Sequence, residues 1–235
     1  MVIGAGAGIG GNVAKRFAKE GFHSVLCRRS NQHGLDDLIR GIEEEGGTAS
    51  GFLINVVEPE SIEECVEKVE DDIGPIETLV FNLGAQVGNK SLSETTYKIF
   101  ELGWRLATFS LFRTASSVLP KMEKRGKGSF LVTTSTAAFR GNAGQHSHAS
   151  AMGGRRMLCQ SLNAEFASKG IHIVHILVDG MVDAPDTLGK MMGPENFEKL
   201  RKIIEWKMMG LFYPIKLQIP IIISHNNIAK HGLTK

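Results

Sequence analysis

The run Met1–Gly11, in which glycine alternates with small residues, constrains the fold of this chain more than any other segment. A short apolar piece precedes Gly4, and a helical pattern begins at Asn12. A pyrophosphate needs backbone N–H groups that it can approach closely, and side chains at these positions would block the approach. The following helix adds unpaired N–H groups and the positive end of its dipole. The run therefore predicts the phosphate-binding turn of a dinucleotide fold, with a mobile glycine turn as the alternative.

Short apolar runs alternate with longer helical patterns along the chain. The strand-like runs are Met1–Ile3, His23–Arg28, Ala49–Asn55, Ile76–Asn82, Gly128–Thr134 and Ile171–Val178. Helical patterns are found at Asn12–Glu20, Leu35–Glu45, Pro59–Ile73, Leu92–Glu123 and Ser150–Ser168. Apolar strands bounded by helices are typical of a parallel sheet that helices cover on both faces. We therefore expect a single α/β domain with a Rossmann-type doubly wound parallel sheet, in which the short first strand lies centrally.

Composition and charge exclude several classes of function. The formal net charge is +2 at pH 7 and no dense Lys/Arg run occurs, so we expect no nucleic-acid partner. No apolar run is long enough to span a bilayer, and glycines interrupt the N-terminal stretch in which a signal peptide would need a continuous apolar run. Cys27, Cys65 and Cys159 lack metal-ligand spacing and are typical of reduced, packed thiols. We expect a cytoplasmic protein with no membrane partner and no metal site.

Polar residues follow the strands at the edge where parallel α/β sheets bind ligands. Arg28 ends the second strand and Arg29 follows it; arginine suits the 2′-phosphate of NADP, whereas a carboxylate would bind the ribose hydroxyl of NAD. Asn55 ends the third strand and is a candidate contact for an adenine edge. Gly84, after the fourth strand, lets the backbone pass close to a cofactor. NADP is the expected cofactor, with NAD as the alternative; solvated arginines and an ordinary strand-terminal asparagine remain alternative interpretations.

Four short motifs share their order and spacing with a known family. The run Gly4–Gly10, preceded by Ile3, is similar to Thr-Gly-x-x-x-Gly-Ile-Gly, and Phe81-Asn82-Leu83-Gly84 is similar to Asn-Asn-Ala-Gly. Ser135 follows a strand as that family's catalytic Ser does, and Ser161–Glu165 is similar to Ser-Leu-Ala-x-Glu. The chain therefore resembles the short-chain dehydrogenase/reductase family over about residues 1–185.

The resemblance implies an NAD(P)-dependent oxidoreductase that transfers a hydride between a nicotinamide cofactor and a small carbonyl or alcohol. Gly180 occupies the place of the family's Pro-Gly near the nicotinamide, with Asp179 in place of the Pro. Together with the strand-end residues, the motifs give the candidate cofactor contacts Gly4, Gly6, Gly8, Ile9, Gly10, Arg28, Arg29, Asn55, Asn82, Gly84 and Gly180.

The proton donor implied by the family is the Tyr of a Tyr-x-x-x-Lys pair, and this chain departs from that pattern. Alignment on Ser161–Glu165 puts His148 at the Tyr and Met152 at the Lys, and Ser135 lies thirteen residues before His148, as in the family. An imidazole titrates near neutral pH, so we predict His148 as proton donor and Ser135 as the group that bonds the substrate oxygen. A polar residue in a degenerate site is the alternative. Met152 has no charge, and we hypothesise that Arg155 supplies part of the missing cation.

The predicted dinucleotide-binding domain covers residues 1–209, with residues 186–209 as the substrate-binding segment and residues 210–235 as an atypical tail. Family members often pair through elements expected in that tail, so a homo-oligomer is left open. Two other hypotheses remain. The first is a dinucleotide-binding or interaction protein that has lost the chemistry, which the missing Tyr and Lys favour; the second is a truncated product that folds poorly.

Overall fold

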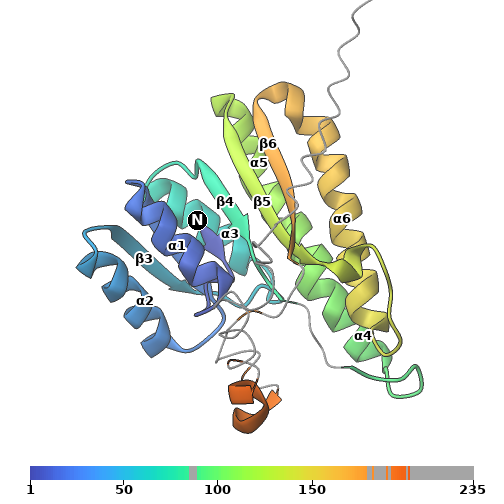
Figure 1. Ribbon diagram of the computed structural model, residues 1–235. Helices are drawn as coiled ribbons and strands as arrows, with labels where there is room; N and C mark the ends of the chain where they lie inside the picture. The colour runs from blue at the N-terminus through green and yellow to red at the C-terminus, as the bar shows by residue number, and fades with distance from the viewer. Residues whose placement is uncertain (85–88, 179–181, 183–188, 190–191, 200, 202–235) are drawn as a thin grey trace, which may run out of the picture.

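A parallel sheet of six strands, in the order β3-β2-β1-β4-β5-β6, is the framework of the part of the chain that the structure describes (Figure 1). The structure is a computed structural model that describes residues 1–84, 89–178, 182, 189, 192–199 and 201. The strands are β1 (Val2–Ile3), β2 (His23–Arg28), β3 (Thr48–Leu53), β4 (Thr78–Phe81), β5 (Gly128–Ser135) and β6 (Ile171–Val178). The strand order confirms the predicted doubly wound α/β fold.

Helices cover both faces of this sheet (Figure 1). They are α1 (Ile9–Lys19), α2 (Gln32–Glu44), α3 (Ser61–Asp72), α4 (Tyr97–Trp104), α5 (Ser110–Arg125) and α6 (His146–Phe166). A π-helical turn, η1 (Arg105–Phe109), joins α4 to α5. Helices α1 and α2 pack on one face of the sheet, and α3, α5 and α6 pack on the other.

Strand β1 lies at the centre of the sheet although it is short. Val2 pairs with Leu26 of β2 and with Val80 of β4, so β1 has neighbours on both sides. Val2 belongs to the core under α1 and α2, whereas Ile3 belongs to the core under α3 and α5, because successive side chains point to opposite faces. The carboxyl end of β1 therefore lies at the point where the strand order reverses, which is the usual ligand edge of such sheets.

The predicted helix Leu92–Glu123 was wrong in two respects: the helix starts later, and it is not a single continuous α-helix. The helix begins at Tyr97, because the Thr96 side chain caps it by accepting a hydrogen bond from the Ile99 N–H at 3.2 Å. The residues before this cap form a turn, in which Glu94 accepts hydrogen bonds from both the backbone and the hydroxyl of Ser91. The π-helical turn η1 then interrupts the α-helical hydrogen bonding before α5 begins.

Helix α6 begins at His146, earlier than the predicted start at Ser150. The carbonyl of Gln145 already accepts a hydrogen bond from the Ala149 N–H at 2.7 Å. Residues 140–149 contain no large apolar side chain, so hydrophobic periodicity carries no signal there. His148 consequently lies in the first turn of α6. The other predicted elements are present, and their ends differ by a few residues from those of the structure.

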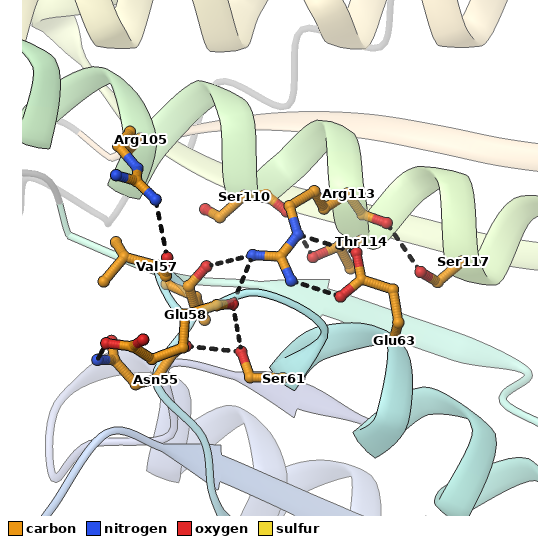
Figure 2. A network of polar contacts seen from close by, with 11 residues as sticks. Asn55, Val57, Glu58, Ser61, Glu63, Arg105, Ser110, Arg113, Thr114 and Ser117 are labelled. Atoms are coloured by element: carbon orange, nitrogen blue, oxygen red, sulfur yellow. Dashed lines mark hydrogen bonds and ion pairs between the residues drawn. The ribbon is translucent and has the colours of Figure 1, made fainter.

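The segment between β3 and α3, which carries Asn55, is fastened to α5 by Arg113 (Figure 2). Arg113 Nη1 donates to the carbonyls of Val56 and Glu58, both at 2.9 Å. Its Nε and Nη2 donate to the two carboxylate oxygens of Glu63. An arginine fork that binds a carboxylate and two carbonyls restrains the segment through several directional contacts. The segment that carries Asn55 is therefore held against α5 by a partly buried ion pair.

Part of the predicted domain lies outside the described residues. Of the predicted substrate-binding segment, the structure describes Gly189, residues 192–199 and Arg201, and the predicted tail 210–235 lies outside. Where the structure does describe the chain, its helices lack the length and apolar character of a membrane-crossing segment.

We predict that Glu63→Gln lowers the free energy of unfolding by about 1 kcal/mol at pH 7. The hydrogen bond from Arg113 lowers the pKa of Glu63 below its ordinary value of 4.5, so the folded chain binds fewer protons at this group than the unfolded chain. The stabilisation is complete above the ordinary glutamate pKa and is lost as pH falls through the lowered folded pKa. Urea unfolding at several pH values should show the two proteins converging at acid pH.

The matched control for this prediction is Glu67→Gln on the same pair of helices. Glu67 contacts Lys121 by one Nζ–Oε2 pair at 2.8 Å, and its side chain is 58% exposed. Exposed single contacts of this kind contribute little, so we expect a change within about 0.5 kcal/mol. Equal destabilisation by the two variants would contradict the special role of the Arg113 fork.

Candidate nucleotide and active site

The turn after β1 requires glycine for steric reasons. Gly4 has φ +93°, and a Cβ atom on it would lie 2.5 Å from the carbonyl oxygen of Asn82. The N–H groups of Gly4 and Ala5 donate to the carbonyl of Cys27 at 2.8 and 2.9 Å. The turn is therefore pressed between the ends of β2 and β4, and a side chain at Gly4 would push these strands apart.

The first turn of α1 packs directly on this glycine turn. A Cβ atom on Gly10 would lie 2.2 Å from the carbonyl oxygen of Gly4, so the helix begins in backbone contact with the turn. Gly8 is the N-cap residue preceding Ile9 and provides no side-chain cap. A Cβ atom on Gly6 would meet nothing within 4 Å, so this glycine borders open space. This cradle next to a helix N-terminus fits a pyrophosphate.

A hollow at the carboxyl ends of β1, β2, β3 and β4 brings several predicted contacts together. Its lining residues are Ile3, Gly4, Cys27, Arg28, Arg29, Ile54, Asn55, Val56 and Leu83. Arg29 is exposed, whereas Arg28 is half-buried and its guanidinium lies near Gly34 at the start of α2. Asn55 donates from its Nδ2 to Glu58 Oε1 at 3.0 Å. The hollow combines apolar walls with two cationic side chains and an amide.

Asn82 connects the glycine turn to the neighbouring strand β5. Its Nδ2 donates to the carbonyl of Gly4 at 3.1 Å, and its Oδ1 accepts a hydrogen bond from the Thr133 hydroxyl at 2.8 Å. Asn82 thus holds the turn through its side chain. Gly84, two residues later, is exposed and has no atom within 4 Å of an added Cβ. Thr133 in this role was not expected from the sequence, because a hydroxyl in a strand gives no distinctive pattern.

Ser135 and His148 lie within hydrogen-bonding distance, with 3.2 Å between Ser135 Oγ and His148 Nε2. Ser135 is the last residue of β5 and is partly accessible, whereas the His148 side chain is buried in the first turn of α6. A hydroxyl in front of a buried imidazole at the ligand edge of the sheet is a pair that can donate and accept a proton.

Met152, one helical turn after His148, is buried against the end of β5. Its side chain is 2% exposed, and its Sδ accepts a hydrogen bond from the Thr134 hydroxyl at 3.3 Å. The thioether brings no charge to this place.

Arg155, which we hypothesised to supply part of the missing cation, has its side chain in the protein core. It is 1% exposed and donates to three backbone carbonyls. Nε bonds Ala107 at 3.2 Å, Nη1 bonds Thr133 at 2.8 Å and Nη2 bonds Leu83 at 3.0 Å. The guanidinium also lies 5.0 Å from the centre of the Phe81 ring. Burial lowers the pKa of Arg155 to about 10. Its hydrogen bonds connect η1, β5 and the segment after β4, so Arg155 stabilises the backbone that surrounds the site.

The sequence did contain a signal for this burial. His148, Met152, Arg155 and Cys159 recur at positions i, i+4, i+7 and i+11, the spacing of one helical face, and all four are buried. The periodicity predicts the buried face, but it does not predict that carbonyls of η1, of β5 and of the segment after β4 would surround a guanidinium.

The predicted contact Gly180 lies outside the described residues, as does Asp179. The described residues contain no group of three or more His, Cys, Asp or Glu side chains arranged to hold a metal ion.

A glycine turn at a helix N-terminus, placed where the strand order of a parallel sheet reverses, defines a dinucleotide-binding protein. The family model described as short chain dehydrogenase matches residues 1–191, and the chain belongs to this family. At the level of reaction class it is an NAD(P)-dependent oxidoreductase that acts on carbonyl or alcohol substrates.

Individual relatives agree with this assignment. The chain is 29% identical to a 3-oxoacyl-[acyl-carrier-protein] reductase of Escherichia coli strain K12 over 190 residues, which cover 80% of this chain and 74% of the relative. A solved short-chain dehydrogenase from Rhodopseudomonas palustris is 34% identical with a TM-score of 0.71, covering 75% of this chain and 82% of that one. A 7α-hydroxysteroid dehydrogenase solved with NADH and 7-oxo glycochenodeoxycholic acid is 27% identical with a TM-score of 0.70, covering 74% and 68%.

We predict that Arg155→Lys destabilises the protein by about 2 kcal/mol, because an ammonium cannot reach three carbonyls that a planar fork reaches together. Denaturant unfolding measures this loss. The control is Arg156→Lys, since Arg156 lies over the Phe139 ring at 4.0 Å from its centre and is only half-buried. We expect the control to change stability by less than about 0.5 kcal/mol. Unaltered stability of Arg155→Lys would refute the bracing role.

Proposed function

We propose that the chain reduces a small carbonyl, or oxidises the matching alcohol, with NADP as cofactor and with Ser135 and His148 as its acid–base pair. The observation that carries this proposal is the 3.2 Å contact between Ser135 Oγ and His148 Nε2 at the carboxyl end of β5. This end of the sheet also carries the glycine turn, so a cofactor held there would lie next to the pair.

The charge of the hollow supports NADP over NAD. Arg28 and Arg29 are its only charged lining residues in the part of the chain that the structure describes. A guanidinium pairs well with a phosphate, whereas recognition of a free ribose hydroxyl usually uses a carboxylate acceptor. Asn55 also lines the hollow, and its amide suits an adenine edge. Gly4, Gly6, Gly8, Ile9 and Gly10 would hold the pyrophosphate.

The bound cofactor would supply or accept the hydride, and the chain's own residues would manage the proton. Ser135 donates a hydrogen bond to the substrate oxygen and passes its proton to that oxygen as negative charge develops there. His148 Nε2, buried behind the hydroxyl, then returns a proton to Ser135 Oγ. The imidazole starts protonated in the reduction direction and ends neutral. Ser135 is thus the catalytic residue, and His148 acts through it.

One observation favours a second candidate function, a dinucleotide-binding protein without turnover. The resemblance puts a lysine where this chain has Met152, and Met152 is buried without a charge. Arg155 donates its hydrogen bonds to carbonyls of the core, so it supports the fold. It therefore does not replace the lysine as the cation beside the cofactor ribose. Cofactor binding with no measurable reduction of any carbonyl would favour this second function.

We predict that the protein binds NADPH more tightly than NADH and that Arg29→Glu weakens NADPH binding at least about tenfold. The physical reason is that a carboxylate at this place repels the 2′-phosphate, while NADH has no such group. Calorimetric titration with both cofactors measures the difference. Arg40→Glu on the outer surface of α2 is the matched charge-reversal control and should leave both affinities unchanged. Equal affinity for the two cofactors would contradict the assignment of the arginines.

We predict that His148→Phe lowers kcat for NADPH-dependent reduction of a carbonyl panel about a hundredfold and leaves the Kd for NADPH unchanged. Phe keeps the ring volume but has no proton to return to Ser135. Ser135→Ala should lower kcat at least as much. His146→Phe, at the start of the same helix, is the control. Full activity of His148→Phe would eliminate the proposed proton path.

A further inference from the structure

Two thiols from different layers of the fold meet directly beneath the nucleotide hollow. Cys27 in β2 and Cys65 in α3 are 38 residues apart in sequence, and their Sγ atoms are 3.8 Å apart. Both side chains are buried, with exposed fractions of 0% and 5%. Cys159, the third cysteine, lies in α6 and is also buried.

The pair is adjacent to the surface through its contact with the hollow. Cys27 lines the hollow together with Ile3, Ile54 and Val56, and the same residues form one apolar cluster with Cys65. Because both side chains are buried, a small, uncharged oxidant such as a peroxide would approach from the hollow and reach the thiols through a local opening of its apolar wall. A nucleotide in the hollow would cover this route.

The two thiols differ in reactivity. A hydrogen bond from Cys27 lowers the pKa of Cys65, so Cys65 is the better source of a thiolate. The same contact, together with burial, raises the pKa of Cys27 well above its ordinary value. Burial also raises the pKa of Cys159 to about 12, which makes Cys159 a poor source of thiolate and a suitable internal control.

We propose that Cys27 and Cys65 are a redox modification site that a peroxide closes to a disulfide and that opposes nucleotide binding. The Cys65 thiolate attacks one peroxide oxygen, the O–O bond breaks, and a sulfenic acid and one water form. The Cys27 sulfur then attacks the sulfenic sulfur, the S–O bond breaks, and the second water leaves with the Cys27 proton. Two thiols and one peroxide thus give one disulfide and two waters.

Closure of the disulfide alters the floor of the hollow. A disulfide needs an S–S distance of about 2.05 Å, so the two sulfur atoms must move together from their separation of 3.8 Å. Cys27 directly precedes Arg28, and its carbonyl accepts the hydrogen bonds of Gly4 and Ala5 in the glycine turn. Movement at Cys27 is therefore transmitted to both the cationic wall and the phosphate cradle.

The coupling is reciprocal by thermodynamic linkage. If the disulfide weakens NADPH binding by some factor, bound NADPH disfavours the disulfide by the same factor. This half of the inference rests on the proposed function, because it places NADP in the hollow. The existence of the disulfide does not depend on that function.

The test treats the full chain with hydrogen peroxide, with and without saturating NADPH, and maps disulfides by mass spectrometry after blocking free thiols. We expect a Cys27–Cys65 crosslink that forms at least about fivefold more slowly with NADPH, and about fivefold or more weaker NADPH binding by the oxidised protein. A thiol reductant should restore the affinity. Cys159→Ser should behave as the parent chain, and Cys65→Ser should show neither the crosslink nor the loss of affinity.

Two results would overturn the inference. If Cys27 and Cys65 remain unlinked after peroxide treatment, or if each oxidises separately to a sulfinic acid, the pair is not a disulfide site. A crosslink that forms at equal rates with and without bound NADPH would eliminate the coupling. If the reduced protein fails to bind NADPH, the proposed function and the coupling fail together, whereas the crosslink map still decides the thiol pair by itself.

Discussion

The backbone contact between the turn after β1 and the end of β4 is the constraint on which the rest of the site depends. Gly4 lies where a Cβ atom would be 2.5 Å from the Asn82 carbonyl, and Gly10 lies where one would be 2.2 Å from the Gly4 carbonyl. Two strands and a helix therefore converge on a turn made of backbone alone. This convergence places the first turn of α1 and the residues after β2 and β3 at the same ligand edge of the sheet.

A buried cation braces the neighbouring half of the ligand edge. Arg155 binds carbonyls of η1, β5 and the segment after β4, and it faces the ring of Phe81. The π-helical turn η1 contributes to this arrangement because its Ala107 carbonyl accepts a hydrogen bond from Arg155. Such a group is costly to bury and is tolerated when its donors are all directed at acceptors. The strand ends that carry Leu83 and Ser135 are thereby held in a fixed relation.

These two supports give the site its chemical character. The half under β2 and β3 is cationic and apolar, which suits an adenosine phosphate. The half under β5 and α6 is less charged and contains a hydroxyl backed by an imidazole. A tyrosine reaches further from its backbone than a histidine, so the contact of His148 with Ser135 favours a relay through the hydroxyl over direct donation to the substrate. The proposed disulfide between Cys27 and Cys65 lies under the half formed by β2 and β3. Its formation would move Cys27 and, with it, the neighbouring Arg28.

The sequence alone determined the class of fold and the positions at which backbone must approach backbone, because strand periodicity, helix periodicity and glycine spacing are local properties. The resemblance to the family, which includes the spacing of thirteen residues, also implied that Ser135 and His148 belong to one site. The sequence did not determine the role of Arg155, the start of α6 at His146 or the meeting of Cys27 with Cys65. Each of these depends on which elements pack against one another. Only the tertiary structure decided them, since burial and hydrogen-bond partners arise between segments far apart in the chain.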